Sequence, residues 1–210
     1  MSSATILLVY ASVAVPAPVA GRGRAVVSKA TTDRTRMPYV VVMGVAGTGK
    51  TTIGRMLAGR LDVPFADADD FHPQANIAKM AAGIPLDDAD RASWLASVGH
   101  WLRGREQART GAVVACSALK RSYRDILRSF VTDIYFLHLT ADRSVLLERL
   151  SARRGHFMPV SLLDSQLAAL EPLQTGEWGT AVHVARPSAE ILEVAVAHLE
   201  EHIDPPATGR

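Results

Sequence analysis

Cysteine is nearly missing from this sequence of 210 residues, and no apolar run is long enough for a membrane span. The single Cys116 excludes an intramolecular disulfide and favours a reducing compartment, the cytoplasm. Apolar residues 113–115 precede it, which indicates a buried thiol at a strand end rather than a nucleophile. The sequence therefore argues against a disulfide scaffold and against a membrane protein.

The first 37 residues differ from the rest of the chain. Residues 5–20 are apolar like the centre of a secretion signal, but no Lys or Arg precedes them and two prolines interrupt them. Residues 21–36 are polar and basic and show no periodicity. We expect residues 1–37 to be a disordered extension, or the result of a start assigned too early, with Met37 as the initiator. A secretion signal is the alternative.

A basic surface for nucleic acid is also missing from the body of the chain. Residues 1–37 carry five basic groups and one acidic group, whereas residues 38–210 carry 18 basic and 20 acidic groups. The net charge of +2 therefore comes from the extension, and we expect no nucleic-acid partner. With 48% apolar residues overall, residues 38–210 are long enough for one well-packed core, so a single domain is expected.

From residue 38 onward, short apolar segments alternate with amphipathic ones, a pattern typical of a parallel sheet with connecting helices. Strands are expected at residues 39–43, 64–66, 112–116, 134–139 and 181–184. Helices are expected at residues 50–61, 90–106, 142–154 and 187–203. Because the strand segments are apolar throughout, helices should cover both faces of the sheet. Core packing is predicted for an apolar stripe at helical spacing: Trp94, Leu95, Val98, Trp101 and Leu102.

A glycine-rich segment joins the first strand to the first helix. It fits the pattern G-x-x-x-x-G-K-[ST] with the sequence Gly44-Val45-Ala46-Gly47-Thr48-Gly49-Lys50-Thr51. Glycines let backbone N–H groups converge on an anion at a helix N-terminus. Lys50 can reach the β- and γ-phosphates of ATP, the Thr51 hydroxyl can bind Mg²⁺, and Thr52 continues the cradle. The sequence predicts a P-loop, which by itself does not identify the reaction.

Two carboxylates, Asp67 and Asp69, stand two residues apart where the second strand ends. Ligands of α/β proteins bind at this end of the strands. One carboxylate can hold a water bound to Mg²⁺, and the other can accept a hydrogen bond from a substrate hydroxyl. The alternative is a solvated acidic loop in which Asp forms turns and caps a helix. Beside a P-loop, the functional interpretation is favoured.

Several further segments resemble the gluconate kinase family of P-loop small-molecule kinases. The matching segments are residues 44–51, 67–73, 76–80, 83–86, 90–91, 94–95, 116–121, 123–125, 155–159, 163–167 and 170–172. The resemblance implies an α/β P-loop NTPase fold like that of the nucleoside-monophosphate and shikimate kinases, with a five-stranded parallel sheet flanked by helices. It also implies a substrate-binding helical region at about residues 68–107 and a lid at about residues 153–172.

The resemblance further implies that gluconate is the acceptor and that ATP with Mg²⁺ is the donor. Asp67 corresponds to the acid associated with magnesium, and Asp69 to the acid that orients the 6-hydroxyl of gluconate and can take its proton. The residues expected to bind gluconate are Asp69, His72, Lys79, Lys120, Arg121, Arg124 and His156. Cationic side chains suit a carboxylate and a polyol. The alternatives are a solvated helix face for the cations that follow the third strand, and a loop contact for His72.

The predicted helix before the lid ends in arginines, as in adenylate-type kinases. On this resemblance Arg149 lies on the adenine ring and Arg153 contacts the phosphates, so the predicted catalytic residues are Lys50, Asp69 and Arg153. A guanidinium group suits both tasks because it stacks on rings and pairs with anions. The alternative is that these arginines only interact favourably with the helix dipole at the C-terminus of the helix. Residues 185–187 are placed like a loop that holds adenine through backbone groups.

Other functions stay open: a kinase for shikimate or a nucleoside monophosphate, or a nucleotide-binding module without catalysis. Residues 72–73 and 116–125 favour gluconate, and the intact P-loop lysine and carboxylate pair argue for catalysis. Serines are frequent in the family where this sequence has Ala46, Thr48 and Thr51, but the hydroxyl for Mg²⁺ is kept. Because bacterial-type relatives are often dimers, a homodimer is expected, with no membrane partner.

Overall fold

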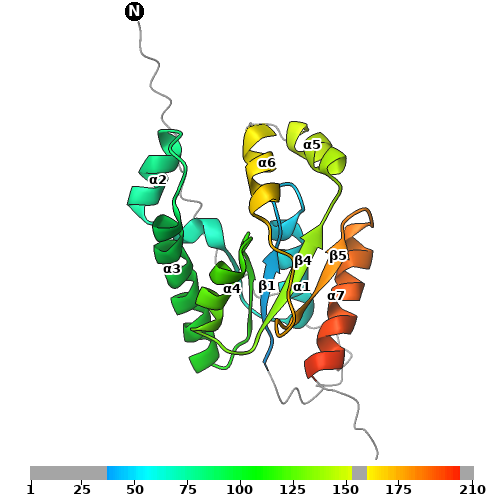
Figure 1. Cartoon of the computed structure of the whole chain (residues 1–210). Coiled ribbons are helices and arrows are strands. Elements are labelled where there is room, and N and C mark those ends of the chain that lie inside the picture. Colours follow the sequence, from blue (N-terminus) through cyan, green and yellow to red (C-terminus); the bar gives the residue numbers. More distant parts are fainter. Residues whose placement is uncertain (1–36, 153–159, 204–210) are drawn as a thin grey trace, which may run out of the picture. The chain divides into compact units, whose positions relative to one another are not determined.

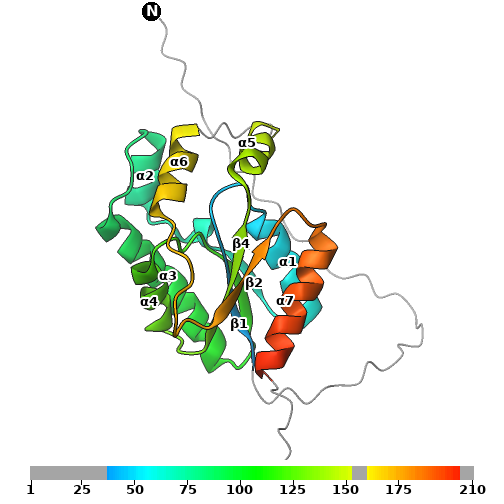
Figure 2. The same cartoon turned by 45° about the vertical axis from the view of Figure 1, so that its right-hand side comes forward.

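The computed structural model describes residues 37–152 and 160–203, which form a five-stranded parallel sheet with helices on both faces (Figure 1, Figure 2). The strands are β1 (Tyr39–Met43), β2 (Phe65–Asp67), β3 (Ala112–Ala115), β4 (Ile134–Thr140) and β5 (Gly179–His183). The helices are α1 (Lys50–Leu61), α2 (Gln74–Ala81), α3 (Asp88–Gln107), α4 (Arg121–Arg128), α5 (Arg143–Ser151), α6 (Val160–Ala169) and α7 (Ser188–Ile203), with a short 3-10 helix η1 (Ala68–Phe71). The predicted α/β fold class is confirmed.

The strand order is β2-β3-β1-β4-β5, so β1 lies at the centre of the sheet. In register, Tyr39 at the start of β1 lies opposite Ala112 on β3 and Ile134 on β4. Every pairing is parallel. The carboxyl ends of the strands therefore meet at one edge, where ligands of α/β sheets bind.

Side chains of β1 alternate between two apolar clusters, one on each face of the sheet. Val40 and Val42 pack with α1 and α7, whereas Tyr39, Val41 and Met43 pack with α3 and α4. All five residues are buried. Burial on both faces explains why the strand reads as a continuous apolar run.

Helix α3 begins at Asp88, two residues before the predicted start, because Asp87 and Asp90 form a capping box. The Asp87 carboxylate accepts from the Asp90 N–H at 2.8 Å, and the Asp90 carboxylate accepts from the Asp87 N–H at 3.0 Å. The apolar stripe of this helix lies in the core as predicted, with four members buried and one partly buried: Trp94, Leu95, Val98, Leu102 and, partly, Trp101.

Two strands at the edges of the sheet differ in their bounds from the prediction. Strand β2 reaches Asp67, which pairs with Ala115 on β3. Strand β5 begins at Gly179, where a Cβ would lie 2.2 Å from the Phe136 carbonyl oxygen, so glycine permits the close approach. Cys116 is buried as predicted, and burial raises the pKa of its thiol to about 12. No helix within residues 37–152 and 160–203 is both long and apolar enough to cross a membrane.

Candidate active site

The phosphate-binding loop follows β1 with backbone angles that favour glycine. Gly44, Gly47 and Gly49 have φ values of 138°, 85° and 89°. A Cβ at Gly44 would also lie 2.5 Å from the Leu139 carbonyl oxygen. The loop leads directly into α1, whose first residue is Lys50, so backbone N–H groups gather at the helix N-terminus. The predicted context of the P-loop, between a buried strand and a helix, is confirmed.

Two side chains of the loop fold back onto its backbone. Lys50 Nζ donates to the Val45 carbonyl oxygen at 3.1 Å, and Thr48 Oγ1 donates to the same oxygen at 2.9 Å. The ammonium group is therefore held at the loop, within the region where P-loop proteins place phosphates.

The two residues predicted for the metal site lie in direct contact. Thr51 Oγ1 donates to Asp67 Oδ2 at 2.8 Å, and Asp67 Oδ1 accepts from the Asp69 N–H at 3.2 Å. One hydroxyl and one carboxylate fit Mg²⁺, which prefers oxygen ligands and is usually held by few side chains together with waters and phosphates. In the described part of the chain, no group of three or more His, Cys, Asp or Glu forms a complete metal cage. The donor set fits a nucleotide-bound Mg²⁺ better than a permanent structural ion.

Asp69 and His72 lie beside this pair, on and just after η1. Desolvation and the negative charge of Asp67 raise the pKa of Asp69. The His72 ring stacks on Trp94 with centroids 4.5 Å apart, and burial lowers the pKa of His72. Trp94 Nε1 in turn donates to the Ala68 carbonyl oxygen at 2.6 Å, which holds η1 against α3. Burial therefore favours the neutral imidazole, and the stacking on Trp94 orients the ring near Asp69.

The three predicted acceptor-binding cations with exposed surface each have an acidic partner. Lys79 Nζ lies 2.6 Å from Asp90 Oδ2, and Lys120 Nζ lies 3.0 Å from both carboxylate oxygens of Asp88. Arg121 Nε lies 3.3 Å from Asp125 Oδ1. The three cationic side chains are 30–38% exposed, so such pairs contribute little to stability and can exchange for a ligand carboxylate.

Arg124 does not lie where the prediction placed it. Its side chain is fully buried and pairs with the equally buried Glu177 through Nε and Nη2, the latter at 2.8 Å. The remaining N–H groups donate to carbonyl oxygens of the β3–α4 loop and of residues 171–172. Every donor of the guanidinium group is used inside the protein, so the prediction that Arg124 binds gluconate is wrong. It ties α4 to the segment after α6.

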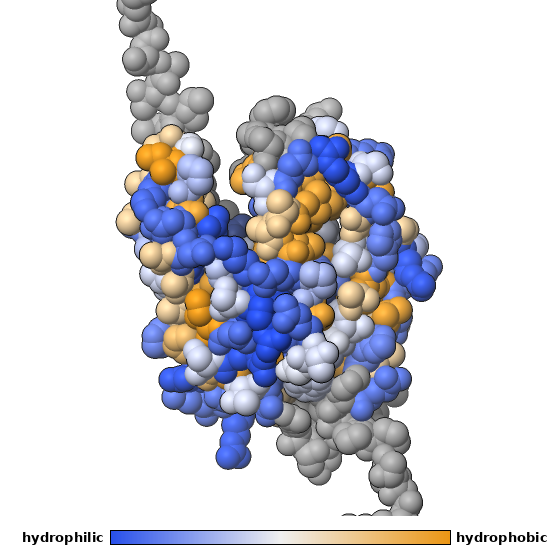
Figure 3. Space-filling model, in the orientation of Figure 1, coloured by the Kyte–Doolittle hydropathy of each residue, from blue (hydrophilic) through white to orange (hydrophobic). Residues whose placement is uncertain are grey.

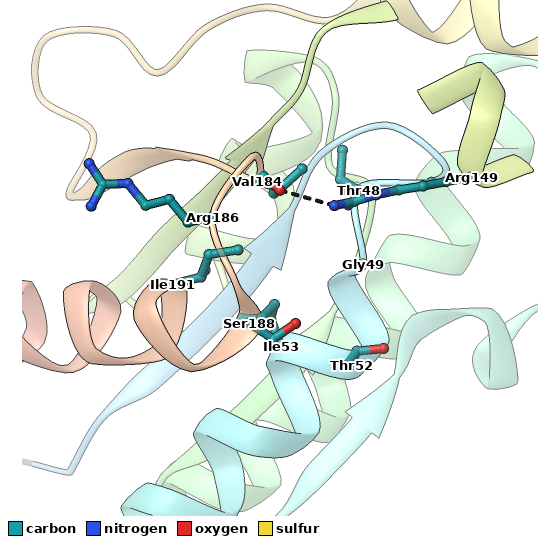
Figure 4. A pocket seen from close by; sticks show the side chains of 10 residues that line it. Thr48, Gly49, Thr52, Ile53, Arg149, Val184, Arg186, Ser188 and Ile191 are labelled. Carbon is teal, nitrogen blue, oxygen red and sulfur yellow. Dashed lines mark hydrogen bonds between the residues drawn. The ribbon is translucent and has the colours of Figure 1, made fainter. Parts of the chain in front are cut away.

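A pocket of about 260 Å³ lies next to the P-loop, with Gly47, Thr48 and Gly49 in its lining. Its lining combines the P-loop, α1, α5, the β5–α7 connection and the start of α7: Gly47, Thr48, Gly49, Thr52, Ile53, Arg149, Val184, Arg186, Ser188 and Ile191. Figure 4 shows Arg149 reaching across it, and Arg149 Nη2 donates to the Val184 carbonyl oxygen at 3.0 Å. The structure thus brings Thr52, Arg149 and the predicted adenine loop together beside the phosphate cradle.

The helical region at residues 68–107 contains η1, α2 and α3, and a hollow separates α2 from α6 (Figure 3). Ile77, Met80 and Ile84 on α2 and the following turn are 43%, 43% and 53% exposed. Such apolar side chains do not suit a polyol, so the cations beyond β3 are the better candidates for acceptor contacts.

Arg153, His156 and the first part of the predicted lid lie outside the described residues, as does nearly all of the 1–37 extension.

Sequence reasoning missed one contact at the P-loop. Gln166 on α6 accepts a hydrogen bond from the Ala46 N–H through Oε1 at 2.7 Å. The two residues are 120 positions apart, so no local sequence pattern indicates the contact. On the acceptor side it also missed Tyr123, whose hydroxyl donates to Asp88 at 2.6 Å and shares that carboxylate with Lys120.

A strand, a P-loop and an acidic pair in this arrangement define a P-loop kinase for a small-molecule acceptor. The family model of shikimate kinase matches residues 46–170. A gluconokinase of Gluconobacter oxydans is 48% identical over 162 residues, which cover 77% of this chain and 91% of that protein. The chain belongs to the gluconokinase family.

Solved structures agree with this assignment. A gluconokinase from Sinorhizobium meliloti is 46% identical, with a TM-score of 0.72 over 80% of this chain and 95% of that one. A sugar kinase from Janibacter is 45% identical, with a TM-score of 0.74 over 83% of this chain and 99% of that one. The predicted family resemblance is confirmed.

Proposed function

We propose that this protein transfers the γ-phosphoryl group of ATP to the 6-hydroxyl of D-gluconate, giving 6-phosphogluconate and ADP. The observation that carries the proposal is the division between two neighbouring carboxylates. Asp67 bonds Thr51 at the P-loop, whereas Asp69 has its pKa raised on the acceptor side. Membership of the gluconokinase family supports gluconate as the acceptor rather than shikimate or AMP.

The residues of the site supply positioning and charge. The P-loop amides and Lys50 hold the phosphates, and Arg149 with the β5–α7 loop holds the adenine ring. Thr51 and Asp67 would hold Mg²⁺, which when bound neutralises charge on the β- and γ-phosphate oxygens. Asp69 accepts a hydrogen bond from the acceptor hydroxyl, places its oxygen in line and takes its proton as the bond to phosphorus forms. Lys120 and Arg121 exchange their acidic partners for the gluconate carboxylate.

Roles for two residues of the predicted lid stay predictions. Arg153 is proposed to contact charge on the transferring phosphoryl group, and His156 is proposed to contact gluconate. A homodimer and a cytoplasmic location also stay predictions.

An assay that couples ADP release to a visible signal tests the proposal. With ATP and Mg²⁺, we expect gluconate to be turned over with a kcat/KM at least about tenfold above shikimate and AMP. The Asp67→Asn variant should need more Mg²⁺ for half-maximal rate, since the Asp67 carboxylate would hold a water bound to the metal. Equal turnover of shikimate or AMP would remove gluconate as the assigned acceptor, and ATP binding without any turnover would favour a non-catalytic module.

A further inference from the structure

One hydrogen bond links the P-loop to a distant helix. The Ala46 N–H donates to Gln166 Oε1 at 2.7 Å. Ala46 directly precedes Gly47, whose positive φ of 85° starts the turn into the phosphate cradle. The backbone amides that lead into the N-terminus of α1 follow from Gly47 onward. Gln166 thus engages the loop just before the amides that bind phosphate in P-loop proteins.

Two contacts anchor helix α6, the helix that carries Gln166. Leu163 is fully buried in a cluster with Val45 of the P-loop and Leu146 of α5. Two residues before Gln166, Asp164 accepts two hydrogen bonds from Arg143 at the start of α5, at 2.8 Å and 3.1 Å. The Gln166 side chain therefore extends from a helix that is already anchored on the P-loop.

The chain after α6 is attached to the acceptor side of the site. The Glu171 N–H donates to the Leu119 carbonyl oxygen at 2.9 Å, and a Glu171 carboxylate oxygen accepts from the Arg121 N–H at 2.5 Å. Buried Arg124 donates to the Glu171 carbonyl oxygen at 3.1 Å. Residues 163–172 therefore contact the P-loop at one end and the β3–α4 loop at the other.

We propose that Gln166 is a positioning residue for the P-loop, supported by residues 163–172, and that it holds the loop in the form that receives the β-phosphate. A loop fixed before binding loses less conformational entropy when the nucleotide binds, so affinity rises without a direct contact to the ligand. The inference rests on the proposed nucleotide site. It predicts a specific effect on nucleotides that carry a β-phosphate.

Calorimetry with Gln166→Met tests this role, because methionine keeps the length of the side chain and removes the acceptor. We expect the Kd of Mg-ADP to rise roughly 3- to 10-fold, in line with one net hydrogen bond. The Kd of AMP, measured by competition, should stay within about twofold, and the melting temperature should stay near that of the wild type. Gln107→Met, at the exposed last residue of α3, is the matched control and should leave all three unchanged.

Amide hydrogen exchange adds a direct readout of the contact. The Ala46 amide should be protected in the wild type and in Gln107→Met, and should exchange faster in Gln166→Met. Faster exchange with unchanged ADP affinity overturns the proposal, and so does an equal loss for ADP and AMP, which would indicate a general structural role. Neither measurement needs gluconate, so failure here is distinct from failure of the proposed reaction.

Discussion

Asp67 and Asp69 are identical side chains in different surroundings. Asp67 accepts hydrogen bonds from the Thr51 hydroxyl and from the Asp69 N–H. Asp69 is the partner whose pKa is raised, by desolvation and by the charge of Asp67. A carboxylate held at the P-loop hydroxyl suits a metal's hydration shell, whereas one with a raised pKa is better suited to take a proton.

The first prediction concerns Asp69, the proposed general base. Asp69→Asn keeps the size of the side chain and one acceptor oxygen but removes the charge, so kcat should fall on the order of 10²- to 10⁴-fold. Affinity for ATP should be nearly intact, because the proposed partner of Asp69 is the acceptor hydroxyl and not the nucleotide. Steady-state kinetics with gluconate and direct ATP binding measure both quantities. Asp70→Asn, at the next residue, whose charge adds least to the raised pKa of Asp69, is the control. Near wild-type turnover in Asp69→Asn would remove Asp69 from the mechanism.

The second prediction concerns the pKa of Asp69 itself. Asp67 disfavours the ionised form of Asp69 by repulsion, so Asp67→Asn should lower the pKa of Asp69 towards its ordinary value. Desolvation, the larger cause, stays in the variant, so the return should be incomplete. Carboxyl NMR titration of the nucleotide-free protein measures the change. An unchanged or higher pKa in Asp67→Asn would show that the two charges do not interact.

Arg124 shows why a charged residue was misassigned from the sequence. Its position after the third strand fits an anion-binding cation as well as a structural one, and its partner Glu177 is 53 positions away. Burial alone would raise the pKa of Glu177, but hydrogen bonds from Arg124 lower it below the ordinary value. The pair thus stays ionised inside the protein. Only the folded chain shows which cations after β3 face the site.

The third prediction tests this pair. Arg124→Met should lower the free energy of unfolding by about 3–5 kcal/mol, the usual cost of breaking a buried ion pair by removing one partner. Arg121, whose Nη1 lies 3.7 Å from Glu177 Oε2, is then the remaining cation beside Glu177. The double variant Arg124→Met, Glu177→Leu removes both charges and should recover much of that loss. Chemical denaturation of the wild type, both single variants and the double variant gives the comparison. Equal stability of Arg124→Met and wild type would contradict a buried ion pair.

At the scale of elements, the sequence predicted the five strands and the four longer amphipathic helices, but it gave no bounds for α2, α4 and α6. Continuous apolar runs indicated five covered strands, and all five are found. The strand order and the Gln166 contact depend on pairings between distant segments, which no local period records. The short edge strands also shifted in their bounds, because β5 begins where Gly179 allows close approach to Phe136.

The fourth prediction uses two glycines of α3. A Cβ at Gly99 would lie 2.3 Å from the Phe130 ring, whereas nothing lies within 4 Å of a Cβ at Gly104. Gly99→Ala should therefore destabilise the protein by about 1–3 kcal/mol through overpacking. Gly104→Ala should stabilise it by up to about 1 kcal/mol through helix propensity. Thermal unfolding of both variants decides, and a shift of the same sign in both would contradict the packing of α3 against Phe130.

At the scale of the whole molecule, the parallel sheet brings the two halves of the site to one edge. The loop after β1 is the P-loop, the end of β2 and the start of η1 carry Asp67 and Asp69, and the segment after β3 carries Lys120 and Arg121. The loop after β5 completes the pocket proposed for adenine.

The last prediction concerns the residues that precede the central strand. The ordered pairing begins at Pro38, whose carbonyl oxygen accepts from the Ala112 N–H at 2.8 Å, and at Tyr39, which is 7% exposed. A chain that starts at Met37 should keep its melting temperature and kcat/KM within error. A chain that starts at Val41 is the matched control: it lacks the first two residues of the central strand and should unfold at much lower temperature. Calorimetry and gluconate turnover of the two truncated chains measure this, and a large loss of folding in the chain from Met37 would show that residues 1–36 pack on the domain.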